Sequence, residues 1–194
     1  MFWQEGVTQE VFDEVPKQLS FEEVNRVSDH ARVPKRFWNA SADFVSDAAV
    51  IKSALNFIQR YNPSTGIVFS GGLGVGKSSL AAMTYRTMVA ARRLSGVWVN
   101  ALDWARIKMD RPIYNNVDWY LAGRDWPLVV IDDVVESQKD FVTNELEILL
   151  RSRLDSELLT IVTTNMDVAN GKTVLCSLLR GFRNLVEVKG ADFR

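Results

Sequence analysis

The most informative segment of the chain is Gly71-Gly72-Leu73-Gly74-Val75-Gly76-Lys77-Ser78. Glycines at this spacing let the backbone approach an anion closely, so that several N–H groups can point at the same phosphates. Lys77 adds a positive charge for the β and γ phosphates, and the Ser78 hydroxyl is placed to ligate Mg²⁺. We therefore predict a triphosphate-binding loop over residues 71–78, and Ser79 completes the expected set of cofactor-binding residues.

The segments on either side of this loop support the prediction. Ile67-Val68-Phe69 is a short apolar run of β type, and residues 78–93 have the pattern of a helix. The N-terminal dipole of that helix would face the bound anion. A glycine-rich turn without a ligand is the alternative, but average residue usage gives this four-position pattern in roughly one such chain in a hundred.

Short apolar runs alternate with helical segments through the rest of the chain, beginning with a helix at 21–30 that Pro34 ends. We expect strands at 97–99, 128–131, 159–163 and 185–188, and helices at 48–59, 140–154 and 172–180. Strands separated by helices favour right-handed crossovers and a parallel sheet covered on both faces, the α/β class. We expect an N-terminal extension over 1–45 with a partner-binding helix, and one nucleotide-binding domain over 46–194.

The bulk composition is that of an ordinary soluble protein, with 47% apolar and 24% charged residues in 194. The net charge of −1 gives no global positive field that would indicate nucleic-acid binding. One cysteine, Cys176, permits no internal disulfide, and a single histidine beside it excludes the usual zinc-finger ligand set. No apolar run reaches the ~20 residues that span a bilayer, and Met1–Glu5 lacks signal-peptide features, so we expect a cytoplasmic protein without membrane contact.

A second motif is the run Leu128-Val129-Val130-Ile131-Asp132-Asp133, which has the form of a buried strand followed by two acids. Asp132 is placed to hold the water shell of Mg²⁺, and Asp133 to orient or deprotonate the attacking water. A strand that merely ends in a polar turn is the alternative. The spacing of about 55 residues from Lys77, with a strand between, favours the catalytic interpretation.

A third motif, Thr163-Thr164-Asn165, ends the strand after the acidic one. If that strand lies between the two motif-bearing strands, Asn165 would face the γ-phosphate, where an amide can position water. The alternative is a turn signal, because Asn-Met-Asp-Val also suits a loop.

Together these segments resemble the DnaC/DnaI helicase-loader and IstB branch of the AAA+ ATPases, over about residues 33–194. Ile131-Asp132-Asp133 is similar to the Walker B motif of that family. Val33–Phe37 with Ala40-Ser41 is similar to the segment that precedes the core in that family. Residues 148–153 and 160–165 are similar to its helix and the sensor-1 strand that follows. Residues 186–194 are similar to its final strand and sensor-2 region.

The resemblance implies a five-stranded parallel sheet with the sensor-1 strand between the Walker strands, and no separate C-terminal lid domain. It makes Asn165 the sensor-1 residue and implies that Arg194 contacts the γ-phosphate of its own subunit. It further implies an arginine finger for a neighbouring subunit, for which Arg180 is preferred over Arg183. A surface cation at a helix C-terminus is the alternative for both. Arg153 also recurs in the resemblance, without a chemical role.

In such loaders, a helical insertion corresponding to 101–124 lines a pore and touches single-stranded DNA. The segment here mixes basic and aromatic residues, which could contact DNA phosphates and stack on nucleobases. However, three aspartates reduce its positive charge. The residues concerned are Trp104, Arg106, Lys108, Arg111 and Tyr114, and the aspartates are Asp103, Asp110 and Asp118. A half-buried amphipathic helix is therefore the favoured interpretation.

The leading functional hypothesis is an ATP- and Mg²⁺-dependent loader that assembles with its own copies, grips a replicative DnaB-like helicase and binds single-stranded DNA. Within the same fold, an IstB-like ATPase that assists a transposase is the alternative. A small nucleotide or metabolite kinase is disfavoured, because two adjacent aspartates and a strand-end Asn form a hydrolase arrangement. A module that binds ATP without turnover also stays open.

Overall fold

The computed structural model describes residues 21–40, 47–60, 62, 66–92, 94–109, 123–136 and 140–190. Its centre is one sheet of five parallel strands in the order β2-β3-β4-β1-β5. The strands are β1 (Gly66–Ser70), β2 (Gly96–Asn100), β3 (Leu128–Val134), β4 (Leu159–Thr164) and β5 (Arg183–Glu187). The predicted sheet is confirmed, and β4 lies between the two strands that carry the glycine loop and the aspartates.

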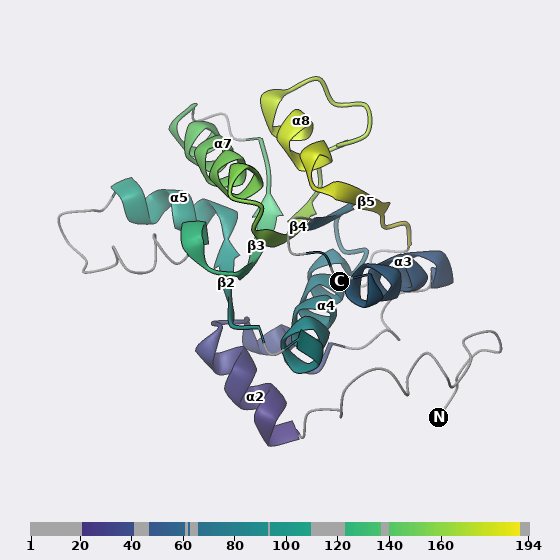
Figure 1. Cartoon of the computed structure of the whole chain (residues 1–194). Coiled ribbons are helices and arrows are strands. Elements are labelled where there is room, and N and C mark those ends of the chain that lie inside the picture. Colours follow the sequence, from purple (N-terminus) through teal and green to yellow (C-terminus); the bar gives the residue numbers. More distant parts are fainter. Residues whose placement is uncertain are drawn as a thin grey trace.

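Helices cover both faces of the sheet (Figure 1). With the labels of that figure, α3 (Ala48–Gln59) and α4 (Lys77–Arg92) pack on one face. The opposite face carries α5 (Ala101–Met109), α7 (Asp140–Asp155) and α8 (Val174–Gly181). The N-terminal α2 (Phe21–His30) and a 3₁₀ turn (Lys35–Phe37) lie beside α4.

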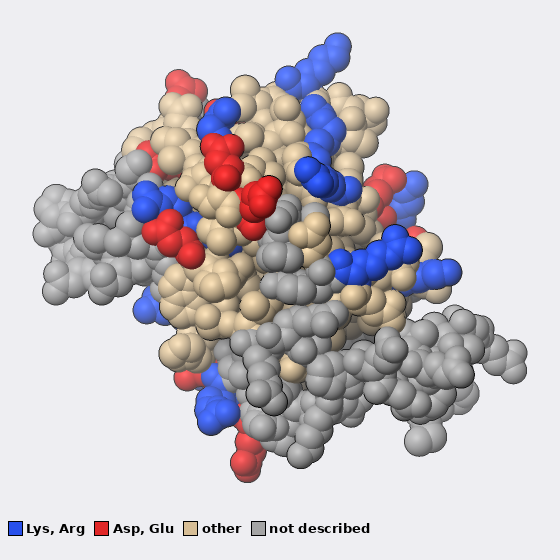
Figure 2. All heavy atoms as spheres, viewed as in Figure 1, with Lys and Arg blue, Asp and Glu red and all other residues tan. Residues whose placement is uncertain are grey.

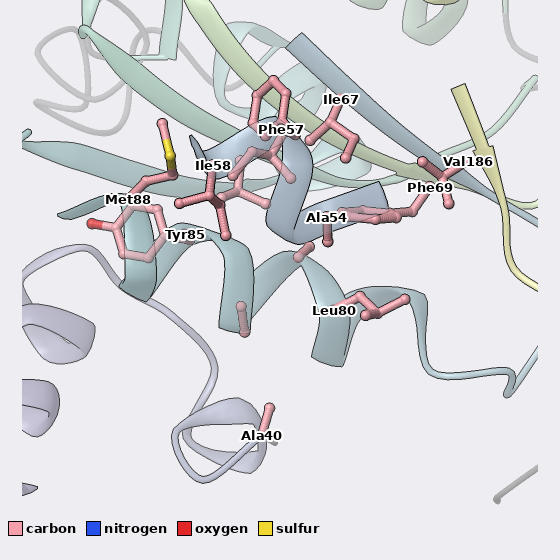
Figure 3. Close-up of a cluster of buried hydrophobic side chains, with 14 of the residues drawn as sticks. Ala40, Ala54, Phe57, Ile58, Ile67, Phe69, Leu80, Tyr85, Met88 and Val186 are labelled. Atoms are coloured by element: carbon pink, nitrogen blue, oxygen red, sulfur yellow. The ribbon is translucent and has the colours of Figure 1, made fainter. Parts of the chain in front are cut away.

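Each inner strand is buried on both sides, which explains its continuous apolar run. In β1, Ile67 and Phe69 contribute to the core under α3 and α4, whereas Val68 belongs to the core under α7 and α8. Figure 3 shows the first of these cores, which contains Phe57 and Ile58 of α3, Ile67 of β1 and Tyr85 of α4. Burial of these side chains fixes the orientation of α4, whose first residue is Lys77.

Residues 31–40 pack against the same core. Hydrogen bonds at two places attach their backbone carbonyls to the rest of the domain. The backbone N–H of Trp98, in edge strand β2, donates to Ala31 O at 2.8 Å. The Arg86 guanidinium on α4 donates to the carbonyls of Trp38 and Ala40, and its burial lowers the pKa of Arg86. Part of the expected extension is thus in contact with the sheet, and the domain division at 45 stays a prediction.

The expected elements differ from the structure mainly at their ends. β3 continues past Asp132 and Asp133 to Val134, because a register shift between Ile131 and Val134 restores pairing with Thr164. Of the two short helices expected in 102–124, the first is α5, and the break around Pro112 lies outside the described residues. In the described part of the chain, which reaches residue 190, no helical lid follows β5, and no helix is long and apolar enough to cross a membrane.

Candidate active site

The glycine loop joins the end of β1 to the start of α4 and turns through left-handed backbone conformations. Gly71, Gly74 and Gly76 have φ values of 147°, 72° and 91°, which L side chains rarely adopt. A Cβ on Gly71 would also lie 2.2 Å from Val188 O, just after β5. The loop therefore needs glycine both for its turns and for its close contact with the neighbouring chain segment.

Lys77 is buried at the first position of α4, and its ammonium turns back over the loop. Its Nζ donates to Gly71 O at 3.1 Å and to Gly72 O. The helix that begins here is 16 residues long, so its N-terminal dipole adds to the charge of the ammonium. The loop thus gathers an ammonium and a helix N-terminus at one place, as the sequence predicts.

Asp132 is buried at the end of β3 and accepts two hydrogen bonds on the same oxygen. The Ser78 hydroxyl donates to Asp132 Oδ1 at 2.7 Å, and the Thr163 hydroxyl donates to it at 2.6 Å. Burial raises the pKa of Asp132, and these two hydrogen bonds act in the opposite direction. Side chains from α4, β3 and β4 therefore meet at this carboxylate.

Asp133 has the opposite environment, since its side chain is exposed. Its φ of 63° lies in the left-handed region, and its N–H donates to Thr163 Oγ1 at 2.8 Å. The Asn165 amide nitrogen lies 3.4 Å from Asp133 Oδ1. The predicted trio Asp132, Asp133 and Asn165 is thus brought together across two neighbouring strands.

The residues present fit a magnesium-bound triphosphate. Mg²⁺ prefers oxygen ligands and is usually held by one or two protein groups together with substrate phosphates and water. Ser78 and Asp132 supply such a hydroxyl and carboxylate within 2.7 Å of each other. The described residues contain no cluster of three or more His, Cys, Asp or Glu side chains that could hold a metal, so this small donor pair suits a cation shared with phosphates.

Thr163 is the member of this site that sequence reasoning missed. The sequence places it in one motif with Asn165 but indicates no role for it. The available signal is a hydroxyl residue two positions before a strand-end amide. The hydroxyl is buried and touches both aspartates.

The two candidate finger arginines lie at the other end of the sheet. Arg183 pairs with Gly66, the first residue of β1, whereas the glycine loop follows the last residue of that strand. Five strand residues place these ends about 15 Å apart. Arg180, in the last turn of α8, donates through Nη1 to Val168 O at 2.6 Å and to Gly171 O at 2.9 Å.

Both candidate arginines are exposed, as is Lys172. Figure 2 shows basic side chains over the α8 and β5 side of the viewed face. Neither Arg180 nor Arg183 belongs to the cluster around Asp132 in its own chain. Arg194 lies outside the described residues.

Arg153 has a structural position far from this cluster and is fully buried on α7. Burial lowers its pKa to about 9, so the side chain keeps its charge at neutral pH. All three of its nitrogens donate hydrogen bonds. Their acceptors are Thr160 Oγ1, Leu159 O, Gly123 O, Arg124 O and Trp126 O.

The segment considered for DNA contact divides into buried and exposed parts. Trp104 is 1% exposed and packs in the core under α5 and α7, so its ring is not available for base stacking. Arg106 is exposed and lies 3.7 Å from Asp103. This supports the half-buried amphipathic helix. Of the other residues, Arg111 and Tyr114 lie outside the described part of the chain.

No protein-family model and no curated protein matches the chain. Solved structures do. The crystal structure of DnaI is 22% identical with a TM-score of 0.66, covering 84% of this chain and 94% of its own. The DnaC helicase loader is 21% identical with a TM-score of 0.68, covering 80% and 99%.

The replication initiator DnaA, bound to AMPPCP and single-stranded DNA, is 15% identical with a TM-score of 0.61. The match covers 79% of this chain and 52% of that one. At these identities the likeness establishes the fold. The chain has the fold of DnaI, DnaC and DnaA, the fold that the sequence resemblance implied.

Proposed function

We propose that this protein binds and hydrolyses ATP with Mg²⁺ and acts in DNA replication as a loader of a replicative, DnaB-like helicase. The observation that carries the catalytic part is the set of contacts from Ser78 through Asp132 and Thr163 to Asp133. The loader part is supported by the fold shared with DnaC and DnaI. The DnaA neighbour with bound AMPPCP supports a nucleotide ligand.

In this proposal, the glycine loop and Lys77 bind the phosphates. Backbone N–H groups of residues 71–78 and the Lys77 ammonium offset the anionic charge. Ser78 and Asp132 would hold Mg²⁺, which neutralises charge on the β and γ phosphates when it is bound. Burial of Lys77 keeps its ammonium in a low-dielectric site, where it acts more strongly than at the surface.

The two aspartates then have separate roles in hydrolysis. Asp132 is buried and its Oδ1 is occupied by two hydroxyl donors, so it serves in positioning. Asp133 is exposed and can accept a proton from the attacking water. The Asn165 amide lies beside Asp133, where it can orient that water and report on the terminal phosphate.

A second copy of the chain would complete the site in this proposal. Arg183 lies at the opposite end of β1 from Lys77, and the contacts of Arg180 are with Val168 O and Gly171 O of its own chain. An arginine supplied by a neighbour would stabilise charge on the transferred phosphoryl group. We keep Arg180 as the proposed finger and Arg194 as the cis contact to the γ-phosphate. Hydrolysis would then depend on self-assembly.

A complementation experiment tests the ATPase and its dependence on assembly. Arg180→Ala has an intact nucleotide site without the finger, and Lys77→Met has the finger without a working site. We expect each variant alone to lose ATP hydrolysis on the order of 10²-fold or more, and a mixture of the two to recover it. The same mixture with Arg183→Ala in place of Arg180→Ala identifies which arginine acts. Full activity of Arg180→Ala at high dilution would exclude this residue as the finger.

The loader function has its own test. Purified protein is mixed with the replicative helicase of its native host and a circular single-stranded DNA, and the helicase bound to DNA is measured with and without ATP. We expect binding of helicase to the circle to require this protein. A protein that hydrolyses ATP but leaves helicase binding unchanged would refute the loader function, and stable capture of a transposase would support the IstB-like alternative.

A further inference from the structure

Thr163 stands opposite both aspartates at an irregularity in the sheet. β3 and β4 pair in register up to Ile131 and Val162, and again at Val134 and Thr164. Two residues of β3, Asp132 and Asp133, therefore face one residue of β4, which is Thr163. An extra residue of this kind bends a strand and re-aims a side chain.

The hydrogen bonds of the Thr163 hydroxyl have a fixed direction. A backbone N–H can only donate, so the hydroxyl oxygen accepts from Asp133 N at 2.8 Å. Its single proton is then free for Asp132 Oδ1, 2.6 Å away. The Ser78 proton points at the same oxygen, at 2.7 Å. Both hydroxyl protons are thereby directed onto Asp132, which leaves the lone pairs of Ser78 Oγ available to a cation.

The same hydroxyl holds the unusual backbone of Asp133. A φ of 63° is unfavourable for a residue with a side chain, and the register shift separates Asp133 from the regular ladder. Thr163 Oγ1 accepts the Asp133 N–H at this point in the strand. In this conformation the Asp133 side chain is exposed, whereas that of Asp132 is buried.

We propose that Thr163 is a positioning residue that holds the two aspartates in their separate orientations, and so controls the rate of ATP hydrolysis more than the binding of ATP. This inference rests on the proposed function. It assigns no contact between Thr163 and the nucleotide. Its action passes through the carboxylate of Asp132 and the backbone of Asp133.

The kinetic test compares Thr163→Val, which removes the hydroxyl at nearly constant shape, with Thr163→Ser, which keeps it. We expect Thr163→Val to lower kcat by about 10- to 100-fold, the usual effect of losing a group that orients a cation ligand. The Kd for ATP should change by less than about 3-fold, and Thr163→Ser should recover most of the rate. Thr160→Val is the matched control, because it removes another buried hydroxyl from β4 at the opposite end of the strand.

A second measurement does not depend on activity. The exchange rate of the Asp133 amide hydrogen is measured by NMR in the nucleotide-free protein. Thr163→Val should speed this exchange by at least about 10-fold, because the acceptor is lost, while Thr163→Ser and Thr160→Val should leave it close to wild type. The Val130 amide, in the regular part of β3, serves as the internal reference.

The outcomes separate the two proposals. Unchanged kcat or unchanged Asp133 exchange in Thr163→Val would overturn the role of Thr163, as would an equal loss of kcat in Thr160→Val. A higher Kd at constant kcat would assign Thr163 to nucleotide binding and also overturn it. A wild-type protein that binds but never hydrolyses ATP would refute the proposed function itself, and with it any effect of Thr163 on rate.

Discussion

At the residue scale, Asp132 and Asp133 are neighbours in the chain with different chemistry. Asp132 points into the protein, where burial raises its pKa and two hydroxyl groups donate to it. Asp133 points to solvent from a left-handed backbone conformation. Because the extra residue in β3 turns one carboxylate inward and the next outward, a single short motif can supply both a cation ligand and a base.

Replacement of Asp133 by Asn should separate catalysis from binding. Asn tolerates a positive φ better than most residues, so the backbone turn is retained. The amide cannot take a proton, and we expect kcat for ATP hydrolysis to fall by about 10²-fold or more. Titration with a fluorescent ATP analogue should give nearly the wild-type Kd. Wild-type turnover in this variant would mean that Asp133 is not the base.

At the element scale, the glycine loop is fixed between β1 and the segment that follows β5. Val188 N donates to Ser70 O at 2.7 Å, which brings this segment against Gly71. Arg153 has a comparable role at the other end of the sheet, where it joins α7 and the start of β4 to residues 123–126. Both are places where parts of the chain remote in sequence meet through backbone groups.

Two adjacent glycines of the loop should respond differently to a methyl group. Gly71→Ala places a Cβ 2.2 Å from Val188 O at a φ of 147°, and we expect a loss of more than about 1 kcal/mol in the free energy of unfolding. Gly72→Ala meets only Val75 Cγ1 at 3.9 Å and should be close to neutral. Urea denaturation of both variants measures the difference. Equal stability of the two would contradict the close contact at Gly71.

Arg153→Met should be among the most destabilising substitutions in the chain. It removes the donors of five hydrogen bonds and leaves buried carbonyl groups without partners. We expect a loss of about 3 kcal/mol or more in urea denaturation. Arg153→Lys should recover only part of this, because an ammonium has fewer donors than a guanidinium. Arg151→Met, at an exposed site on the same helix, is the control and should change stability by less than about 0.5 kcal/mol.

At the scale of the whole molecule, the strand order decides which side chains can cooperate. Because β4 lies between β1 and β3, Thr163 and Asn165 come next to the aspartates, although about 30 residues separate them in sequence. The parallel direction of all strands also places the start of β5, with Arg183, at the edge away from the glycine loop. Site and candidate finger are thus separated within one chain.

The N-terminal segment is attached to this sheet through Arg86 and the edge of β2. Arg86→Met should release the carbonyls of Trp38 and Ala40 and loosen the exposed turn at Lys35 and Arg36. We expect trypsin to cleave this turn at least about 5-fold faster than in wild type, because cleavage follows local opening. Arg106→Met, which removes an exposed cation elsewhere on the surface, is the control. Equal cleavage rates would mean that other contacts hold the segment.

Local sequence patterns were enough to predict the elements and most of the residues of the candidate site. The glycine spacing, the apolar runs and the strand-end acids are local signals. Backbone conformation and burial on both sheet faces restrict which residue types can occupy consecutive positions. Lys77, Ser78, Asp132, Asp133 and Asn165 were all predicted from such signals. The strand order came from resemblance to a family and was confirmed by the sheet.

How these residues contact one another depends on tertiary packing. The register shift in β3 depends on pairing with β4, and no local pattern specifies it. The outward turn of Asp133 and the contacts of Thr163 with both aspartates could therefore not be predicted. Trp104 and Arg153 show the same limit, since amphipathic side chains can face water or a core, and the packing of α5 and α7 buried both. The polar residues of the candidate site are connected by contacts between strands that are distant in the sequence.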